Sequence, residues 1–296
     1  MRYKDNGSGD QVFYQNMKGV KTMDRRKAIT TIAGGVAVAG LTGTTLVRNA
    51  VASQPQKRQA PKLDNRGKVY HEPLPYVKLD PLEAQDRAYK NKLIGDCQYG
   101  VLATVVEMLA EKVGEPYVTY PITYSRVGAG GTVGWGGTCG SLLGASELIY
   151  LVSPDPVPLI DDVFNFYMYT SLPDQRPKTA NEDITPSIAD SILCHISISH
   201  WTSVSKAKAF SKTRSKRCAQ LAGSITRRCV EALNAQLAGN FKSTATIPAV
   251  VAECRACHDR GGEMENTRGK QDCLACHDGH DEVKPNLYDR ISSMKK

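Results

Sequence analysis

Two pentapeptides near the C-terminus contain the residues best suited to chemistry. Residues 254–258 read Cys-Arg-Ala-Cys-His and residues 273–277 read Cys-Leu-Ala-Cys-His, with fifteen residues between the second and third of these cysteines. In this pattern the two cysteine sulfurs add across the vinyl groups of a haem, and the histidine that follows becomes the proximal ligand of the iron. The spacing therefore predicts two haem c groups per chain. Their attachment residues are Cys254, Cys257, Cys273 and Cys276, and their proximal ligands are His258 and His277.

The same four cysteines also match the general spacing of a structural zinc site, C-x2-C-x15-C-x2-C. Two observations favour haem over zinc. A histidine follows each cysteine pair directly, and zinc does not need one at both places. The chain also begins with the features of an export signal, and an exported protein is where covalent haem attachment is expected.

The export signal is predicted in residues 1–52. Paired arginines, Arg25 and Arg26, precede a weakly apolar run over residues 29–47 and then Ala50-Val51-Ala52, which is a small-x-small cleavage pattern. This arrangement resembles a twin-arginine (Tat) signal that starts at Met23. Four glycines interrupt the apolar run, which makes it a poor spanning helix. We therefore expect cleavage after Ala52, a periplasmic protein and no stable membrane span.

Composition sets the remaining bounds. With 296 residues and 41% apolar content, the chain is long enough to bury a sizeable core. The net charge is +8, but residues 1–52 contain eight Lys or Arg against three Asp or Glu, so that the mature chain is left with +3. The haem propionates lower it further. Charge therefore gives no reason to expect a nucleic-acid partner.

The hydrophobic periodicity predicts a mainly α-helical protein with long irregular loops. Residues 53–79 read as an extended arm, 80–240 as a helical body that bears cysteines, and 241–296 as a di-haem segment that orders around its cofactors. Within the body we expect helices over 80–93, 97–112, 141–151, a short piece around 161–169, and 205–237. The alternation of apolar and polar residues over 192–201 predicts a strand or an extended segment.

Five cysteines lie outside the haem motifs. Cys139 follows a glycine-rich run, residues 128–140, and is expected at the N-terminus of a helix, where the helix dipole stabilises a thiolate. Cys218 and Cys229 are eleven residues apart, or about 16 Å on a straight helix. A break at Gly223-Ser224 would bring them together.

The iron atoms also need distal ligands, and four histidines remain to supply them. They are His71, His195, His200 and His280. His280 is only three residues after His277, so it would have to reach the neighbouring haem or one in a second subunit. We favour His280 and His195 as distal ligands, followed by His71.

The order of these motifs resembles a known family. Cys97, the Gly-Trp-Gly-Gly-Thr-Cys-Gly run that ends at Gly140, Cys218 and Cys229 resemble a redox-active family whose signature is Cys, Gly-rich Cys, Cys, Cys. Joined to the Tat-like signal and two C-terminal CxxCH motifs, residues 70–296 resemble the split-Soret cytochrome c family. Thr138 stands where the signature has glycine.

The resemblance implies a periplasmic, mostly helical homodimer with two stacked haems per subunit, each with two histidine ligands. It also implies an iron–sulfur cluster, here a [2Fe-2S] cluster, on Cys97, Cys139, Cys218 and Cys229. Two disulfides are the alternative for an exported protein, although Cys194 would then be left over. If both irons carry two histidines, the protein exchanges electrons with redox partner proteins and is not an enzyme. The alternative is a haem enzyme that reduces nitrite or peroxide at an open iron site.

Overall fold

The body of the protein starts from a helical hairpin. The structure is a computed structural model, and it describes residues 72–274 and 277. Its first helix, α4 (Pro81–Val113), is kinked at Asp96, where φ is 70° and ψ is −169°. The kink confirms the two helices predicted on either side of Gly95 and Asp96. We call residues 81–95 the first arm and residues 97–113 the second arm.

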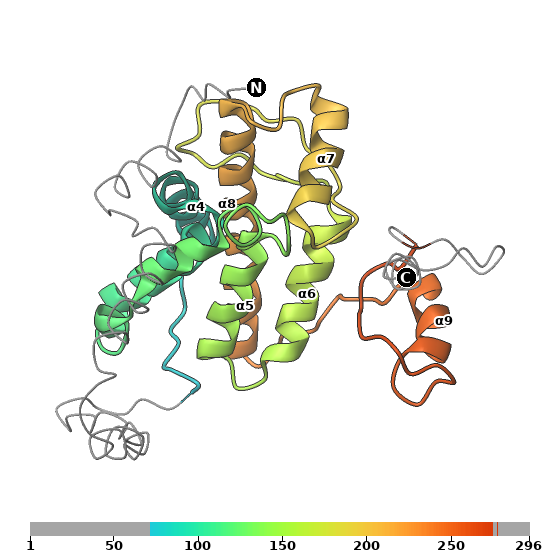
Figure 1. Cartoon of the computed structure of the whole chain (residues 1–296). Helices are drawn as coiled ribbons and strands as arrows, with labels where there is room; N and C mark the ends of the chain where they lie inside the picture. Colours follow the sequence, from blue (N-terminus) through green and yellow to red (C-terminus); the bar gives the residue numbers. More distant parts are fainter. Residues whose placement is uncertain (1–71, 275–276, 278–296) are drawn as a thin grey trace, which may run out of the picture. The chain divides into compact units, whose positions relative to one another are not determined.

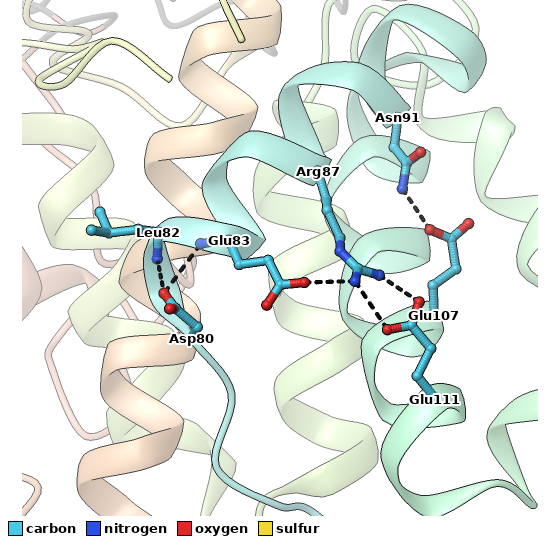
Figure 2. Close-up of polar contacts among 7 residues, drawn as sticks. All are labelled: Asp80, Leu82, Glu83, Arg87, Asn91, Glu107 and Glu111. Atoms are coloured by element: carbon cyan, nitrogen blue, oxygen red, sulfur yellow. Dashed lines mark hydrogen bonds and ion pairs between the residues drawn. The ribbon is translucent and has the colours of Figure 1, made fainter. Parts of the chain in front are cut away.

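A cap begins the first arm of α4, and an ion pair joins that arm to the second arm (Figure 2). The Asp80 carboxylate accepts hydrogen bonds from the amides of Leu82 and Glu83, at 2.8 and 3.2 Å, and so caps the first arm. Arg87 then binds Glu83 in its own arm and Glu111 in the opposite arm, both at 2.6 Å. Such exposed ion pairs contribute little individually, but they show that the arms lie side by side.

Three further helices pack with α4 around the core of the body. Two short 3₁₀ turns, η1 (Tyr117–Thr119) and η2 (Ile122–Gly128), lead through the glycine-rich loop to α5 (Gly140–Val152), and α6 (Pro156–Tyr169) follows at once. The long helix α8 (Lys212–Leu237) packs mainly against α4 and also against α5 and α6 (Figure 1). Ser211 caps α8 through a 3.1 Å hydrogen bond from the amide of Arg214.

One prediction about these elements was wrong. Residues 194–205 form a helix, α7 (Cys194–Ser205), where a strand or an extended segment was expected. The break at Gly223-Ser224 that would bring Cys218 and Cys229 together does not occur, and α8 runs through both residues. A Cβ on Gly223 would lie 3.0 Å from the carbonyl oxygen of Gln85, so this glycine allows the first arm of α4 to approach closely.

The core lies between α4, α5, α6 and α8. Its fully buried side chains include Leu102, Leu109, Leu142, Leu148 and Ile225. The described residues contain two isolated β-bridges and no strand, which confirms the mainly α-helical class. The helix α4 is long and apolar enough to cross a membrane, but 67% of its most apolar stretch is buried inside the protein. That burial is expected of a core helix.

Candidate haem and cysteine sites

The first CxxCH motif ends a helix. Cys254, Cys257 and His258 lie on the last turns of α9 (Ala249–His258), so the two cysteines stand one turn apart on the same face. Cys257 is exposed and Cys254 is partly exposed. Beyond α9 the chain returns over it, because the amides of Asn266 and Thr267 donate to the carbonyl oxygen of His258 at 3.0 and 3.1 Å.

The return of the chain also orients the His258 ring. Its Nδ1 lies 2.8 Å from Oδ1 of Asn266, and because that oxygen only accepts, Nδ1 is the protonated nitrogen. In this tautomer Nε2 carries the lone pair that a metal binds. Hydrogen bonds of this kind fix the ring of a metal ligand and raise its basicity. No motif in the sequence points to Asn266, since only the fold brings it to the ring.

Replacing Asn266 with Leu is expected to weaken this control of the ligand. The imidazole becomes less basic and stabilises ferric iron less, so the midpoint potential of a haem that His258 ligates should rise. Loss of such a hydrogen bond to a metal ligand costs about 10- to 100-fold in metal affinity in other sites. A spectroelectrochemical titration measures the haem potential, and Asn266→Gln, which keeps an acceptor, is the matched control. Equal potentials in both variants would contradict the assignment.

The second motif lies against the first. The thiol of Cys273 hydrogen-bonds to that of Cys254, and burial together with this neighbour raises the pKa of Cys273. The amide of His277 donates to the carbonyl oxygen of Cys273 at 2.9 Å, which is a helical turn across the motif. Cys276 lies outside the described residues. The attachment cysteines that open the two motifs are therefore neighbours.

Only part of the predicted distal set can be placed. His71 and His280 lie outside the described residues. His195 is the second residue of α7, and its Nδ1 lies 2.8 Å from the carbonyl oxygen of Gly136. Because a carbonyl oxygen only accepts hydrogen bonds, Nδ1 carries the hydrogen and the metal-binding lone pair is on Nε2. His200, by contrast, has its Nδ1 3.4 Å from the carboxylate of Asp190. Among the described residues, no hydrogen bond or ion pair joins His195 to either CxxCH motif.

Side-chain contacts attach the haem segment to the body. The carboxylate of Asp162 on α6 is fully buried, and it accepts from the amide and hydroxyl of Thr244 at 3.0 and 2.9 Å and from Arg228 at 2.8 Å. Lys270 forms an ion pair with Asp161 at 2.7 Å, with both side chains partly exposed. Near the second motif, the side chain of Gln271 lies 3.2 Å from the Ser191 hydroxyl.

A separate group of cysteines lies inside the body. Cys97 begins the second arm of α4, Cys139 caps α5, Cys194 begins α7 and Cys218 lies on α8. The amide of Cys139 donates to the carbonyl oxygen of Ile192 at 2.8 Å, and the amide of Cys194 donates to that of Gly137 at 2.7 Å. The thiols of Cys97 and Cys218 hydrogen-bond to each other. We call these four residues the buried cysteine group.

The glycine-rich loop provides the space for this group. A Cβ on Gly140 would stand 2.9 Å from the Cβ of Cys97, and one on Gly131 would stand 2.9 Å from the Cβ of Cys194. Gly131 also has a φ of +69°, in the left-handed region that favours glycine. The density of glycines therefore reflects close approach of the loop to the cysteines.

Cys229 is not brought to this group. Because α8 is continuous, Cys218 and Cys229 remain about 16 Å apart along its axis. Burial raises the pKa of Cys229, and the charged groups that act on it are Arg228 and Asp162, with no contribution from another cysteine. Cys194, which had no assigned role, lies instead near Cys139 and Cys218.

Protonation differs within the buried cysteine group. Burial raises the pKa of Cys139 more strongly than the neighbouring groups lower it. The expected thiolate at this helix N-terminus is therefore not favoured. Burial also raises the pKa of Cys194, to about 12. Cys218 is the exception. Its pKa is lowered because it accepts the hydrogen bond of Cys97, and Arg217 and Lys92 act in the same direction.

The residues present fit an anionic iron–sulfur group better than a single metal ion. Among the described residues, no three His, Cys, Asp or Glu side chains converge closely enough to bind one ion. A cluster with bridging sulfides spreads its cysteine ligands further apart and takes four thiolates. Two buried polar atoms close in the chain to these cysteines, Nε of Arg217 and the hydroxyl of Ser141, have no hydrogen-bond partner among the described residues.

Comparison with known proteins places this arrangement in context. No protein-family profile matches the chain. The split-Soret cytochrome c of Desulfovibrio desulfuricans is 34% identical over 259 residues, which are 83% of this chain and 91% of that protein. A solved structure of split-Soret cytochrome c from the same species, described as having a novel iron centre, has a TM-score of 0.66 at 33% identity and covers 70% of this chain and 90% of its own. The relative is more than 30% identical and covers most of the chain, and the helical fold is matched in a solved structure, so the chain belongs to the split-Soret cytochrome c family.

Proposed function

We propose that this cytochrome is a periplasmic electron carrier with two haem c groups, each ligated by two histidines. The observation that carries the proposal is the contact between Cys254 and Cys273, because it keeps the two attachment sites together and so favours rapid exchange of electrons between haems. Haem supplies the reversible one-electron chemistry, and the chain supplies ligands and exposure. Bis-histidine ligation would leave no open position on iron for a substrate.

In this proposal the two distal ligands are His280 and His195, with His71 as the next candidate, and at least one of them comes from the helical body or from a second copy of the chain. The tautomer of His195, with its metal-binding lone pair on Nε2, supports this role. The functional unit is then a homodimer that docks redox partner proteins and has no enzymatic activity of its own.

An EPR spectrum of the oxidised protein, combined with a pyridine haemochrome assay, tests this proposal. We expect two haems per chain and wholly low-spin iron. A stoichiometric high-spin signal would contradict it and would favour reduction of a small oxidant at an open iron site. The location is tested by recording the same EPR spectrum on the periplasmic and cytoplasmic fractions of cells, and the signal is expected in the periplasmic fraction.

A second redox station is proposed in the body, a [2Fe-2S] cluster on Cys97, Cys139, Cys218 and Cys194. Three observations support it: the convergence of these four cysteines from four elements, the two unpartnered polar atoms close to them in the chain, and the iron centre described for the relative. Iron and acid-labile sulfide are counted in protein purified without oxygen. We expect two irons and two sulfides beyond the haem iron, and iron confined to haem would contradict the cluster.

A further inference from the structure

Two buried cations lie beside the buried cysteine group. Arg217 is 1% exposed and Lys92 is 3% exposed, and neither forms an ion pair with any carboxylate among the described residues. The other arginines nearby on α8 differ in this respect. Arg227 pairs with Asp174 and Glu231, and Arg228 pairs with Asp162.

The hydrogen bonds of both cations go to neutral groups. Nη2 of Arg217 donates to the hydroxyl of Ser197 at 3.0 Å and lies 3.5 Å from that of Ser187, while its Nε has no partner among the described residues. Nζ of Lys92 donates to the carbonyl oxygen and the hydroxyl of Ser215, at 3.2 and 3.0 Å. The serines accept some of the hydrogen bonds that these two side chains can donate, but they are neutral and do not balance the positive charges.

A buried charge without a counter-charge is costly, and proteins pair such groups or bind a ligand there. The ionisable groups that Arg217 faces are Cys139, Cys194 and Cys218, together with Tyr167. Lys92 faces Cys97 and Cys218. Both cations therefore face the Cys218 sulfur, and between them they face all four cysteines of the group. They come from different elements, because Lys92 lies on the first arm of α4 and Arg217 on α8.

We propose that Arg217 and Lys92 are the counter-charges of the anionic cysteine-ligated centre, and that Arg217 sets its reduction potential. The inference rests on the proposed cluster, and it makes both cations positioning residues for that group. Four thiolates bound to an iron–sulfur centre give it a net negative charge. One-electron reduction adds one further negative charge from a haem or a redox partner, with no bond made or broken. Fixed positive charge in a buried site stabilises the reduced form, and so raises the potential.

The test compares Arg217→Met, which removes the charge, with Arg217→Lys, which keeps it. The cluster potential is measured by redox titration followed by EPR, and the haem potentials in the same sample serve as an internal reference. We expect Arg217→Met to shift the reduction equilibrium about tenfold toward the oxidised form, which is 59 mV for a one-electron couple. Arg217→Lys should recover most of the shift, and haem content should be unchanged in both.

Arg227→Met is the matched control, because it removes one positive charge from the same helix about 15 Å further along the axis. It should leave the cluster potential unchanged. Loss of the cluster from Arg217→Met but not from Arg217→Lys would support the inference, since charge then decides retention.

If the wild type contains the cluster, two results would overturn the inference. One is a cluster potential in Arg217→Met equal to that of the wild type, which leaves the proposed cluster intact. The other is an equal shift, or equal loss of the cluster, in the Met and Lys variants, which would show that shape rather than charge matters. Iron confined to haem in the wild type would overturn the cluster and this inference together, so the two failures are distinguishable.

Discussion

Asp162→Ala is expected to lower the free energy of unfolding by about 3–5 kcal/mol, because removal of one partner strands the other in a buried pair. The Asp162 carboxylate is fully buried, and it satisfies Arg228 and both donors of Thr244. Loss of this carboxylate also releases the segment that connects α8 to α9. Urea unfolding followed by circular dichroism measures the stability, and limited proteolysis near residues 241–248 reports the release of the segment.

The neighbouring residue supplies the control. Asp161 forms its ion pair with Lys270 at the surface, where such pairs contribute about 0–1 kcal/mol. Asp161→Ala should therefore unfold close to the wild type and keep the segment protected from protease. If Asp162→Ala behaved like Asp161→Ala, burial would not be what gives this contact its strength, and the proposed anchor for the haem segment would be wrong.

Local signals in the sequence predicted local structure well. Asp80 with Pro81 predicted the start of α4, and Gly95-Asp96 predicted its interruption, because capping and left-handed backbone depend on a few adjacent residues. The CxxCH motifs belong to the same class, since chain geometry over five residues places the cysteines and the histidine. Reasoning of this kind needs no knowledge of distant segments.

The predictions that failed depend on contacts between distant segments. The alternation over residues 192–201 predicted an extended segment, but Trp201 is fully buried with its Nε1–H donated to the carbonyl oxygen of Thr185 at 3.0 Å, and Ser197 faces Arg217. The body thus buries two residues that share a face of the helix α7. Gly223 was interpreted as a helix stop, although it serves close packing against α4.

The buried cysteine group shows the same limit. The family signature grouped Cys218 with Cys229, although about 16 Å would separate them on one straight helix. Cys194 was left aside, since nothing near it in the sequence indicates a partner. The fold joins residues 192–194 to the glycine-rich loop by backbone hydrogen bonds and so brings Cys194 toward Cys139. Buried cations were missed as well, because Lys92 and Arg217 look like ordinary surface residues of amphipathic helices.

Replacement of Cys194 is expected to have the second large effect, which is loss of the proposed cluster. Cys194→Ala should remove most of the iron and acid-labile sulfide beyond the haem iron, because a cluster that lacks one of four thiolates loses a coordinate bond and a negative charge beside two cations. Cys229→Ala should keep both, since that residue lies about 16 Å along α8 from Cys218. Haem content, read from the pyridine haemochrome, should be the same in both variants.

Cys229→Ala also removes a fully buried side chain, so a loss of stability there is expected and is measured separately by urea unfolding. The opposite pattern, with iron lost from Cys229→Ala and kept in Cys194→Ala, would restore the ligand set implied by the sequence signature and would require α8 to break at Gly223 when iron is bound.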